Sequence, residues 1–423
     1  MRNASPLLSM SIFGVLFFIF GFVTWLNGSL IPFLKVLCNL DTFEALLVTF
    51  AFYIAYTVTA LPMAAVLERT GYKNGMALGL GIMSAGALLF IPAALSADYR
   101  LFLAGLFTLG TGLTLLQTAS NPYLVHIGPA ESAAARISVM GLINKSAGVL
   151  APLLFTAVVF GSLGEPLDAS ASAAQKAAVA AKLVPPYLTM ASILALLGVF
   201  VRLSPLPALP FEKHTSRTTQ SLLKHPHLLL GAVTLFFYVG IEVIAGDTIG
   251  LYAQSIGVSG ATALTAYTMV FMVLGYLLGV VAIPRYLSQE RALQLSALAG
   301  ILFTAGIVFG SATSHTVASL LWGWSGIATL PDTLSFVALL GLSNALVWPA
   351  VWPLALKNLG PLTAKGSALL IMGIAGGAIL PLLFGTVGEA AGSLRYGYLL
   401  GFACYGFILY YATLGHKAGM SRD

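Results

Sequence analysis

Two acidic residues, Glu242 and Asp247, stand inside an apolar stretch that runs from about His227 to Gln254. The stretch is long enough to cross a bilayer, which takes about 20 apolar residues. A charged side chain near the bilayer centre costs about 2.5–3.5 kcal/mol on insertion scales, so such residues are kept where they face protein or a water-filled cavity. Acids in this setting can bind a cation or carry a proton.

The spacing of the two acids leaves both chemistries open. On an ideal helix, residues five apart point about 140° away from each other, so a shared ion requires the helix to unwind at Gly246. Na⁺ is a hard cation, and carboxylates with freed backbone carbonyls suit it. Proton carriage instead needs one buried carboxylate that can hold a proton. We expect Glu242 and Asp247 to be the ion-coupling and Na⁺-binding pair, with H⁺ as the alternative ion.

Amide and aromatic side chains at helical spacing form a second candidate group. Gln117 and Asn121 are four apart and share a helix face, as do Asn344 and Trp348. Amides both donate and accept hydrogen bonds, which suits sugar hydroxyls, and an aromatic face can stack on the C–H face of a sugar. The alternatives are backbone satisfaction, interhelical contacts and ordinary packing. The expected substrate-binding residues are Trp25, Asn27, Gln117, Asn121, Asn144, Asn344 and Trp348.

Lys145 is the basic residue that lies farthest from a span end. It stands about eight residues into an apolar stretch, or about 12 Å deep at ~1.5 Å per residue. We expect it to act in ion coupling, either by pairing with an acid or as an internal cation. The alternative is that its long stem lets the ammonium reach the cytoplasmic headgroups.

The composition defines the setting in which these residues act. The 423-residue chain is 58% hydrophobic and 8% charged, whereas soluble domains average about 25% charged residues. The chain is therefore expected to be a polytopic, all-α membrane protein. Its net charge of +6 is spread over the ends of the apolar stretches, which does not indicate a nucleic-acid partner. The expected partners are a small molecule and the lipid bilayer, with the protein as a monomer.

Apolar stretches between charged or Pro/Gly-rich breaks predict twelve membrane spans in two six-helix bundles. The bundles are expected at 1–206 and 227–423, with a cytoplasmic linker at 207–226. The predicted spans are 7–32, 43–67, 74–96, 101–125, 137–161, 184–206, 227–254, 262–286, 292–313, 333–356, 366–387 and 394–415.

The basic residues also predict the orientation. With both termini in the cytoplasm, fourteen Lys and Arg residues lie at the inner ends of the spans and five at the outer ends. Basic residues favour the cytoplasmic side, so we expect a multi-pass protein of the inner (cell) membrane with both termini inside.

An internal repeat indicates that the two halves are related. The stretches 136–155 and 365–384 each begin with a basic residue, have a Gly at the same offset and end in the string PLLF. The first span aligns likewise with the seventh, so that Phe17 corresponds to Phe236. Duplicated six-helix halves are typical of one large transporter architecture, in which the substrate binds between the halves.

Several strings resemble a known family. PMAAVLERTGYK (Pro62–Lys73) resembles the charged loop of the major facilitator superfamily. The string LLQTASNPYLVHIGPAESAAARISVMGLINKSAG (Leu115–Gly148) is more specific. With FGFVTWLNGSLIP (Phe20–Pro32) and LKNLGPLTAKGSALLIMGIAGG (Leu356–Gly377), it resembles the fucose:proton symporter family, above all its glucose/galactose branch. The resemblance covers nearly the whole chain, and it implies a sugar symporter with twelve helices.

The resemblance implies site residues but also shows departures. The fucose symporters carry a functional Asp where this chain has Gly28, and a functional Glu where it has Gln117. By the internal repeat, Asp247 is the counterpart of the missing Asp, so coupling is expected to have moved to the second half. Sodium-coupled members of the branch fit this shift. The resemblance implies a substrate contact for Asn144 and a gating latch formed by Glu68, Arg69 and Lys73.

These observations predict a secondary active transporter that imports a neutral, glucose- or galactose-like hexose with a cation, by alternating access and without a cofactor other than the coupling ion. A proton-coupled symporter, including one for fucose or an N-acetylhexosamine, is the alternative. An exporter and a non-transporting sugar sensor fit less well. No nucleophile–base pair or metal cluster lies at membrane depth in the sequence, so an enzyme is not expected.

Overall fold

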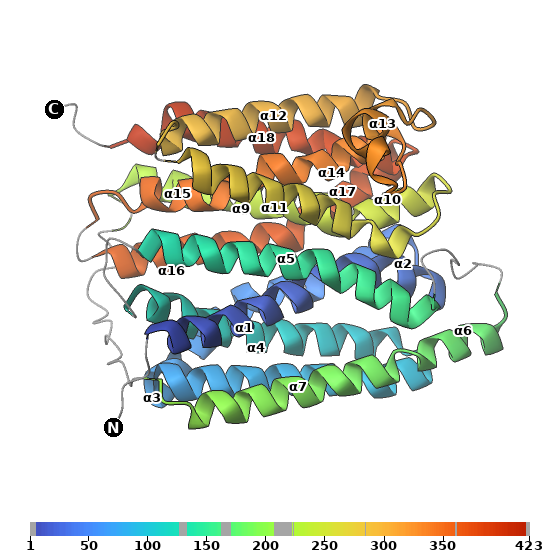
Figure 1. The fold of residues 1–423 in the computed structure, drawn as a ribbon, viewed down its shortest axis with the longest axis horizontal. Coiled ribbons are helices and arrows are strands. Elements are labelled where there is room, and N and C mark those ends of the chain that lie inside the picture. Colours follow the sequence, from blue (N-terminus) through green and yellow to red (C-terminus); the bar gives the residue numbers. More distant parts are fainter. Residues whose placement is uncertain are drawn as a thin grey trace. The chain divides into compact units, whose positions relative to one another are not determined.

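The computed structural model describes residues 6–126, 133–161, 171–206, 222, 224–283, 285–359 and 362–419, and all the regular structure in these ranges is helical. The side chains of a few further residues, Asn121 among them, lie outside this description. Figure 1 shows the helices running side by side, with their long axes nearly aligned within each half of the sequence.

The helices are those of a protein that spans a membrane many times. Ten of the described helices are long and apolar enough to cross a bilayer. One of them, α3 (Thr42–Ser96), has 55 residues, and Gly71 interrupts it with φ 73° and ψ 169°, so α3 contains two crossings. The short helices η7 (Leu394–Leu399) and α18 (Leu400–Thr413) follow each other directly and form one more. The predicted twelve-span, all-α architecture is confirmed.

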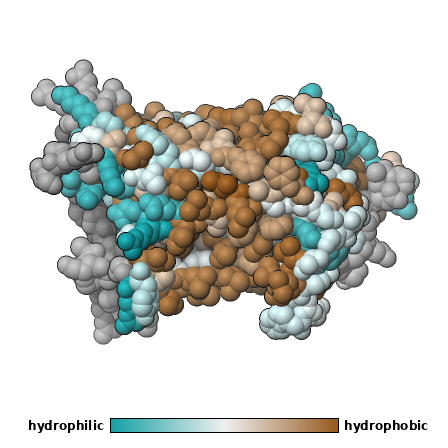
Figure 2. Space-filling model, turned by 90° about the horizontal axis from the view of Figure 1, so that it is seen from above, coloured by the Kyte–Doolittle hydropathy of each residue, from teal (hydrophilic) through white to brown (hydrophobic). Residues whose placement is uncertain are grey.

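The outer faces of the helices suit lipid. On α7 (Val184–Leu203), Leu196, Val199 and Leu203 are 57–77% exposed. Figure 2 views another side of the molecule, where apolar side chains cover the middle and hydrophilic ones gather toward the two ends. Large exposed apolar side chains in such a band mark contact with the acyl chains rather than with water.

The helices group into two compact units, Met1–His214 and Thr215–Asp423. The boundary falls in the predicted linker 207–226, most of which lies outside the described residues. The first unit contains α1 (Pro6–Trp25), α2 (Asn27–Leu37), α3, α4 (Tyr99–His126), α5 (Ala133–Phe160), α6 (Ala173–Ala181) and α7. The second contains α9 (Pro226–Asp247), α10 (Ile249–Ser255), α11 (Thr265–Ala282), α12 (Gln289–Phe309), α13 (Thr316–Trp322), α14 (Asp332–Asn344), α15 (Val347–Ala355), α16 (Thr363–Met372), α17 (Gly376–Ala390), η7 and α18.

Equivalent helices of the internal repeat pack on each other in both units. In the first unit α1 packs on α5, and a Cβ at Gly21 would lie 1.9 Å from the Asn144 carbonyl oxygen. In the second unit α9 packs on α17, and a Cβ at Gly376 would lie 1.8 Å from the Phe236 carbonyl oxygen. Only glycine permits such close backbone approach at these two positions. The pairing of α1 with α5 and of α9 with α17 matches the repeat read from the sequence.

Candidate functional site

Glu242 is a buried acid set among tyrosines of the second unit. It lies on α9 and is 7% exposed. The Tyr238 hydroxyl, one turn earlier, donates a hydrogen bond of 2.7 Å to Glu242 Oε1. The phenols of Tyr276 on α11 and Tyr405 on α18 lie within electrostatic range of the same carboxylate. Three helices therefore bring polar aromatic groups to one acid at membrane depth.

Asp247 is fully buried at the last residue of α9. The Thr265 hydroxyl donates to the Gly246 carbonyl at 2.7 Å, and the Thr268 hydroxyl donates to the Ala245 carbonyl at 3.0 Å. These bonds from α11 hold the last turn of α9 in helical form through Gly246. The break comes two residues after Gly246, at Thr248, before α10 begins.

The helical path through Gly246 bears on the expected two-carboxylate site. Because α9 is unbroken from Pro226 to Asp247, its two acids keep the angular separation of about 140° that five helical residues impose. Unwinding at Gly246, which a shared ion would need, is not seen. Among the described residues, no cluster of three or more His, Cys, Asp and Glu side chains could hold a metal ion.

Asn344 is the second buried polar group of this unit. It ends α14 and has no exposed surface. Its Oδ1 accepts a 2.8 Å hydrogen bond from the Tyr405 hydroxyl, whereas its Nδ2 has no hydrogen-bond partner among the described residues. Trp348, at the start of α15, has its ring centre 6.2 Å from that of Tyr238. The amide, the acid and the indole thus belong to one neighbourhood built by α9, α14, α15 and α18.

In the first unit, Lys145 and Trp25 contact each other directly. The Lys145 ammonium lies 4.4 Å from the centre of the Trp25 ring, and the two side chains are 8% and 2% exposed. A cation over an indole face is stabilised electrostatically. This contact speaks against the alternative in which the ammonium reaches the headgroups. It also means that one face of Trp25 carries a cation in this structure.

The amides of the first unit are placed in three different ways. Asn144 Nδ2 donates to the Phe17 carbonyl of α1 at 3.3 Å, which is an interhelical contact. Gln117 Nε2 donates to the Tyr56 hydroxyl at 3.3 Å and joins α4 to α3. Asn27 is 1% exposed, and its Nδ2 has no partner among the described residues. The Asn121 side chain lies outside the described residues, so its expected role is not addressed.

The expected gating loop surrounds the break in α3. Glu68 and Arg69 are exposed. Lys73, two residues after Gly71, donates to the Ser204 carbonyl at the end of α7. The loop is thus tied to a neighbouring helix end, and its gating role stays a prediction.

Sequence reasoning missed the tyrosines that surround the polar groups. Tyr238 stands four residues before Glu242, and this i, i+4 spacing could have identified it as a donor. Tyr405 comes from the last helix, so no local pattern links it to Asn344.

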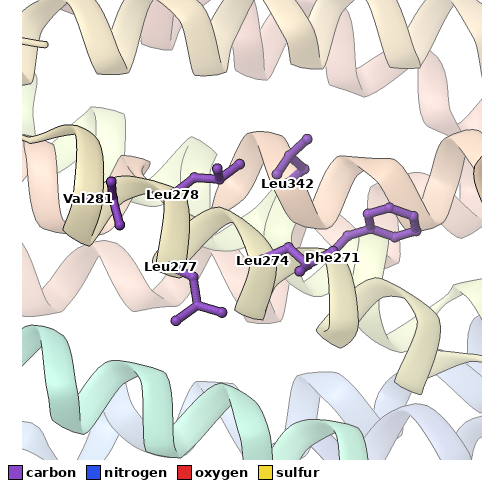
Figure 3. Close-up of a pocket in the computed structure, with 6 residues that line it drawn as sticks. All are labelled: Phe271, Leu274, Leu277, Leu278, Val281 and Leu342. Atoms are coloured by element: carbon purple, nitrogen blue, oxygen red, sulfur yellow. The ribbon is translucent and has the colours of Figure 1, made fainter. Parts of the chain in front are cut away.

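A cavity in the second unit is lined differently. Its walls are six apolar side chains of α11 and α14: Phe271, Leu274, Leu277, Leu278, Val281 and Leu342 (Figure 3). It offers no side-chain polar group for hydroxyls, so it is not the candidate site.

Comparisons with known proteins agree with this architecture. The sequence profile of the Major Facilitator Superfamily matches residues 13–384. The glucose/galactose transporter of Brucella abortus is 34% identical over 411 residues, covering 96% of this chain and 93% of that protein. The L-fucose-proton symporter of Escherichia coli is 26% identical over 431 residues, covering 97% and 94%. The crystal structure of the transporter FucP in the outward conformation matches with a TM-score of 0.72 and 26% identity, over 97% of this chain and 99% of that one.

The chain belongs to the Major Facilitator Superfamily. It is a multi-pass membrane transporter and not an enzyme. The resemblance to the fucose:proton symporters and their glucose/galactose relatives is confirmed. Sodium, the first expectation for the coupling ion, receives no support from these relatives, because the fucose transporters among them are named as proton symporters.

Proposed function

We propose that this transporter imports a neutral hexose of the glucose or galactose type together with a proton, by alternating access. The observation that carries the proposal is the pairing of two buried groups in the second unit: Glu242, held by Tyr238, and Asn344, held by Tyr405. An acid that can take up a proton and an amide that can bind a hydroxyl share one aromatic setting. The names of the relatives support a hexose as cargo.

Glu242 is the proposed proton carrier. It is an ionisable side chain, 7% exposed inside a membrane-spanning helix, and the Tyr238 phenol donates a hydrogen bond to it; acids in this position commonly serve proton relays in transporters. A sodium ion would need a shell of oxygen ligands. The sequence expected Asp247 to share this task. Thr265 and Thr268 hold the carbonyls of Gly246 and Ala245, so Asp247 lies at the end of a regular helix and not in an unwound segment.

Substrate binding is proposed for amides of both units. Gln117 and Asn27 would bind hydroxyls from the first unit and Asn344 from the second, with Trp348 as a stacking face. Asn144 joins α5 to α1, so its part is to set the spacing of these helices. Lys145, on Trp25, is a fixed positive charge that the transporter carries through its cycle.

We also propose both termini in the cytoplasm, two bundles at 1–206 and 227–423, and a monomer.

Sugar accumulation in proteoliposomes tests the proposal. An inward proton gradient should drive accumulation of labelled glucose, and a sodium gradient at fixed pH should not. Glu242→Gln should abolish accumulation but retain exchange of internal for external sugar, because exchange needs no net proton movement. Glu389→Gln, an exposed acid at the end of α17, is the matched control and should behave as wild type. Uptake that follows sodium and ignores the proton gradient would refute proton coupling.

A further inference from the structure

The buried Asn344 amide uses its oxygen in a hydrogen bond, whereas its nitrogen has no partner among the described residues. The residue has no exposed surface, and its Nδ2 group has no partner among the described residues. Buried polar groups in native proteins are nearly always hydrogen-bonded, so an exception calls for an explanation. If Asn344 binds sugar as proposed, its buried Nδ2 group can donate a hydrogen bond to an oxygen of the ligand.

The Tyr405 hydroxyl pairs with the oxygen half of the amide and leaves the nitrogen half open. An Asn side chain has one acceptor oxygen and a nitrogen with two donor hydrogens. Tyr405 donates its only hydroxyl proton to the oxygen at 2.8 Å. The phenol of Tyr238, in the same neighbourhood, donates its proton to Glu242. Tyr405 therefore uses one lone pair of the Asn344 oxygen, while the nitrogen keeps its donor hydrogens for a ligand.

The Tyr405 ring is itself held in place by its neighbours. It is fully buried, and a Cβ at Gly300 of α12 would lie 2.4 Å from two of its ring atoms. The ring lies directly over the backbone of Gly300, because a glycine leaves that space free. Because the ring packs against α12, the hydroxyl oxygen is held beside the Asn344 side chain.

We propose that Tyr405 is a positioning residue for specificity, which turns the Asn344 nitrogen toward the ligand as a hydrogen-bond donor. The site then selects a sugar oxygen that accepts a hydrogen bond at this point. The inference rests on the proposed sugar-binding role of Asn344. A fluorine in place of that hydroxyl keeps an acceptor, whereas a deoxy position offers none. At the ring carbon of the sugar that faces Asn344, the fluoro analogue should therefore bind more tightly than the deoxy analogue.

Competition binding tests the inference on the full-length protein in detergent. Labelled glucose is displaced by the complete sets of monodeoxy and monodeoxyfluoro glucoses. In the wild type, one ring position should show a deoxy analogue that binds about tenfold more weakly than its fluoro analogue. Tyr405→Phe frees the amide to turn, so this tenfold difference should vanish at that position alone. Tyr411→Phe is the control, since its hydroxyl, on the same helix, donates to the His227 carbonyl instead.

Asn344→Asp provides a second, independent variant. An ionised Asp keeps an oxygen for Tyr405 but has no donor, so the fluoro analogue should lose its advantage while Tyr405 keeps its bond. If Asn344→Asp weakens binding and Tyr405→Phe leaves the deoxy/fluoro pattern unchanged, the positioning role is refuted and sugar binding by Asn344 stands. If Asn344→Asp binds every analogue as the wild type does, both the inference and the sugar-binding role of Asn344 are refuted.

Discussion

The ammonium of Lys145 lies 4.4 Å from the centre of the Trp25 indole ring, and both side chains are buried inside the first unit. The sequence indicated separate tasks for these residues, a stacking face for sugar and an ion partner. Because the two side chains contact each other, a change at one of them should also affect the other. A desolvated cation–π pair of this kind is worth about 2 kcal/mol, enough to keep a positive charge in place within the helices.

Lys145 should influence how transport responds to membrane potential. Moving one elementary charge through the membrane field changes the energy by about 2.3 kcal/mol per 100 mV. Lys145→Met removes one charge from the moving protein, so the dependence of initial uptake rate on an imposed potassium diffusion potential should change. Lys145→Arg keeps the charge and should retain the wild-type dependence. The control is Lys182→Met, at an exposed position after α6; an unaltered voltage response in Lys145→Met would contradict a cycle in which this charge moves.

Gln117 should contribute directly to sugar affinity. Its amide donates to Tyr56, and removing it leaves polar groups of the site without a partner, which costs about 1–3 kcal/mol. Gln117→Ala should therefore weaken sugar binding by roughly fivefold to 150-fold. Thr118→Ala is a suitable control, because the Thr118 hydroxyl bonds within its own helix to the Thr114 carbonyl. Wild-type affinity in Gln117→Ala, measured by calorimetry, would place Gln117 outside the sugar site.

The sequence predicts the helices more directly than the site, because helices follow from local sequence features whereas the site depends on contacts between residues far apart in the chain. The two crossings within α3 follow from the apolar runs on either side of Gly71, which are local features. Whether α9 is helical or unwound at Gly246 depends on hydroxyl groups of α11, which are remote in sequence. Local reasoning therefore favoured unwinding at a glycine that tertiary contacts keep helical. The link from Asn344 to Tyr405 spans 61 residues and no periodicity reveals it.

The glycine contacts of the two repeats should contribute to the stability of each unit. Gly21→Ala and Gly376→Ala place a methyl group within 2 Å of a backbone oxygen of the neighbouring helix, which forces the helices apart. Each should destabilise the protein by about 1–3 kcal/mol. The controls are Gly81→Ala and Gly406→Ala, where the added methyl group meets nothing within 4 Å. There the better helix propensity of Ala should leave stability equal or raised by up to about 1 kcal/mol.

Thermal unfolding in detergent, followed by circular dichroism, measures all four glycine variants. The expected order places Gly21→Ala and Gly376→Ala below the wild type, and the two controls at or above it. Equal melting temperatures for all four would show that the helices can separate at no cost, which would contradict the close packing of α1 on α5 and of α9 on α17.

Cys38 offers a test of the orientation with a defined pH dependence. It follows α2 directly, beyond the membrane-spanning stretch, and burial, followed by the nearby Asp98 carboxylate, raises the pKa of its thiol to about 11. Because only the thiolate reacts, labelling by a charged maleimide should be slow at pH 7 and should rise about tenfold per pH unit up to pH 9, well below the pKa. Cys404 is 1% exposed within α18 and should stay unlabelled, so Cys38→Ser should remove the signal.

The same label tests the orientation. With both termini in the cytoplasm, the end of α2 faces outward, so Cys38 should be labelled in intact cells. Labelling in inverted vesicles alone would reverse the proposed topology.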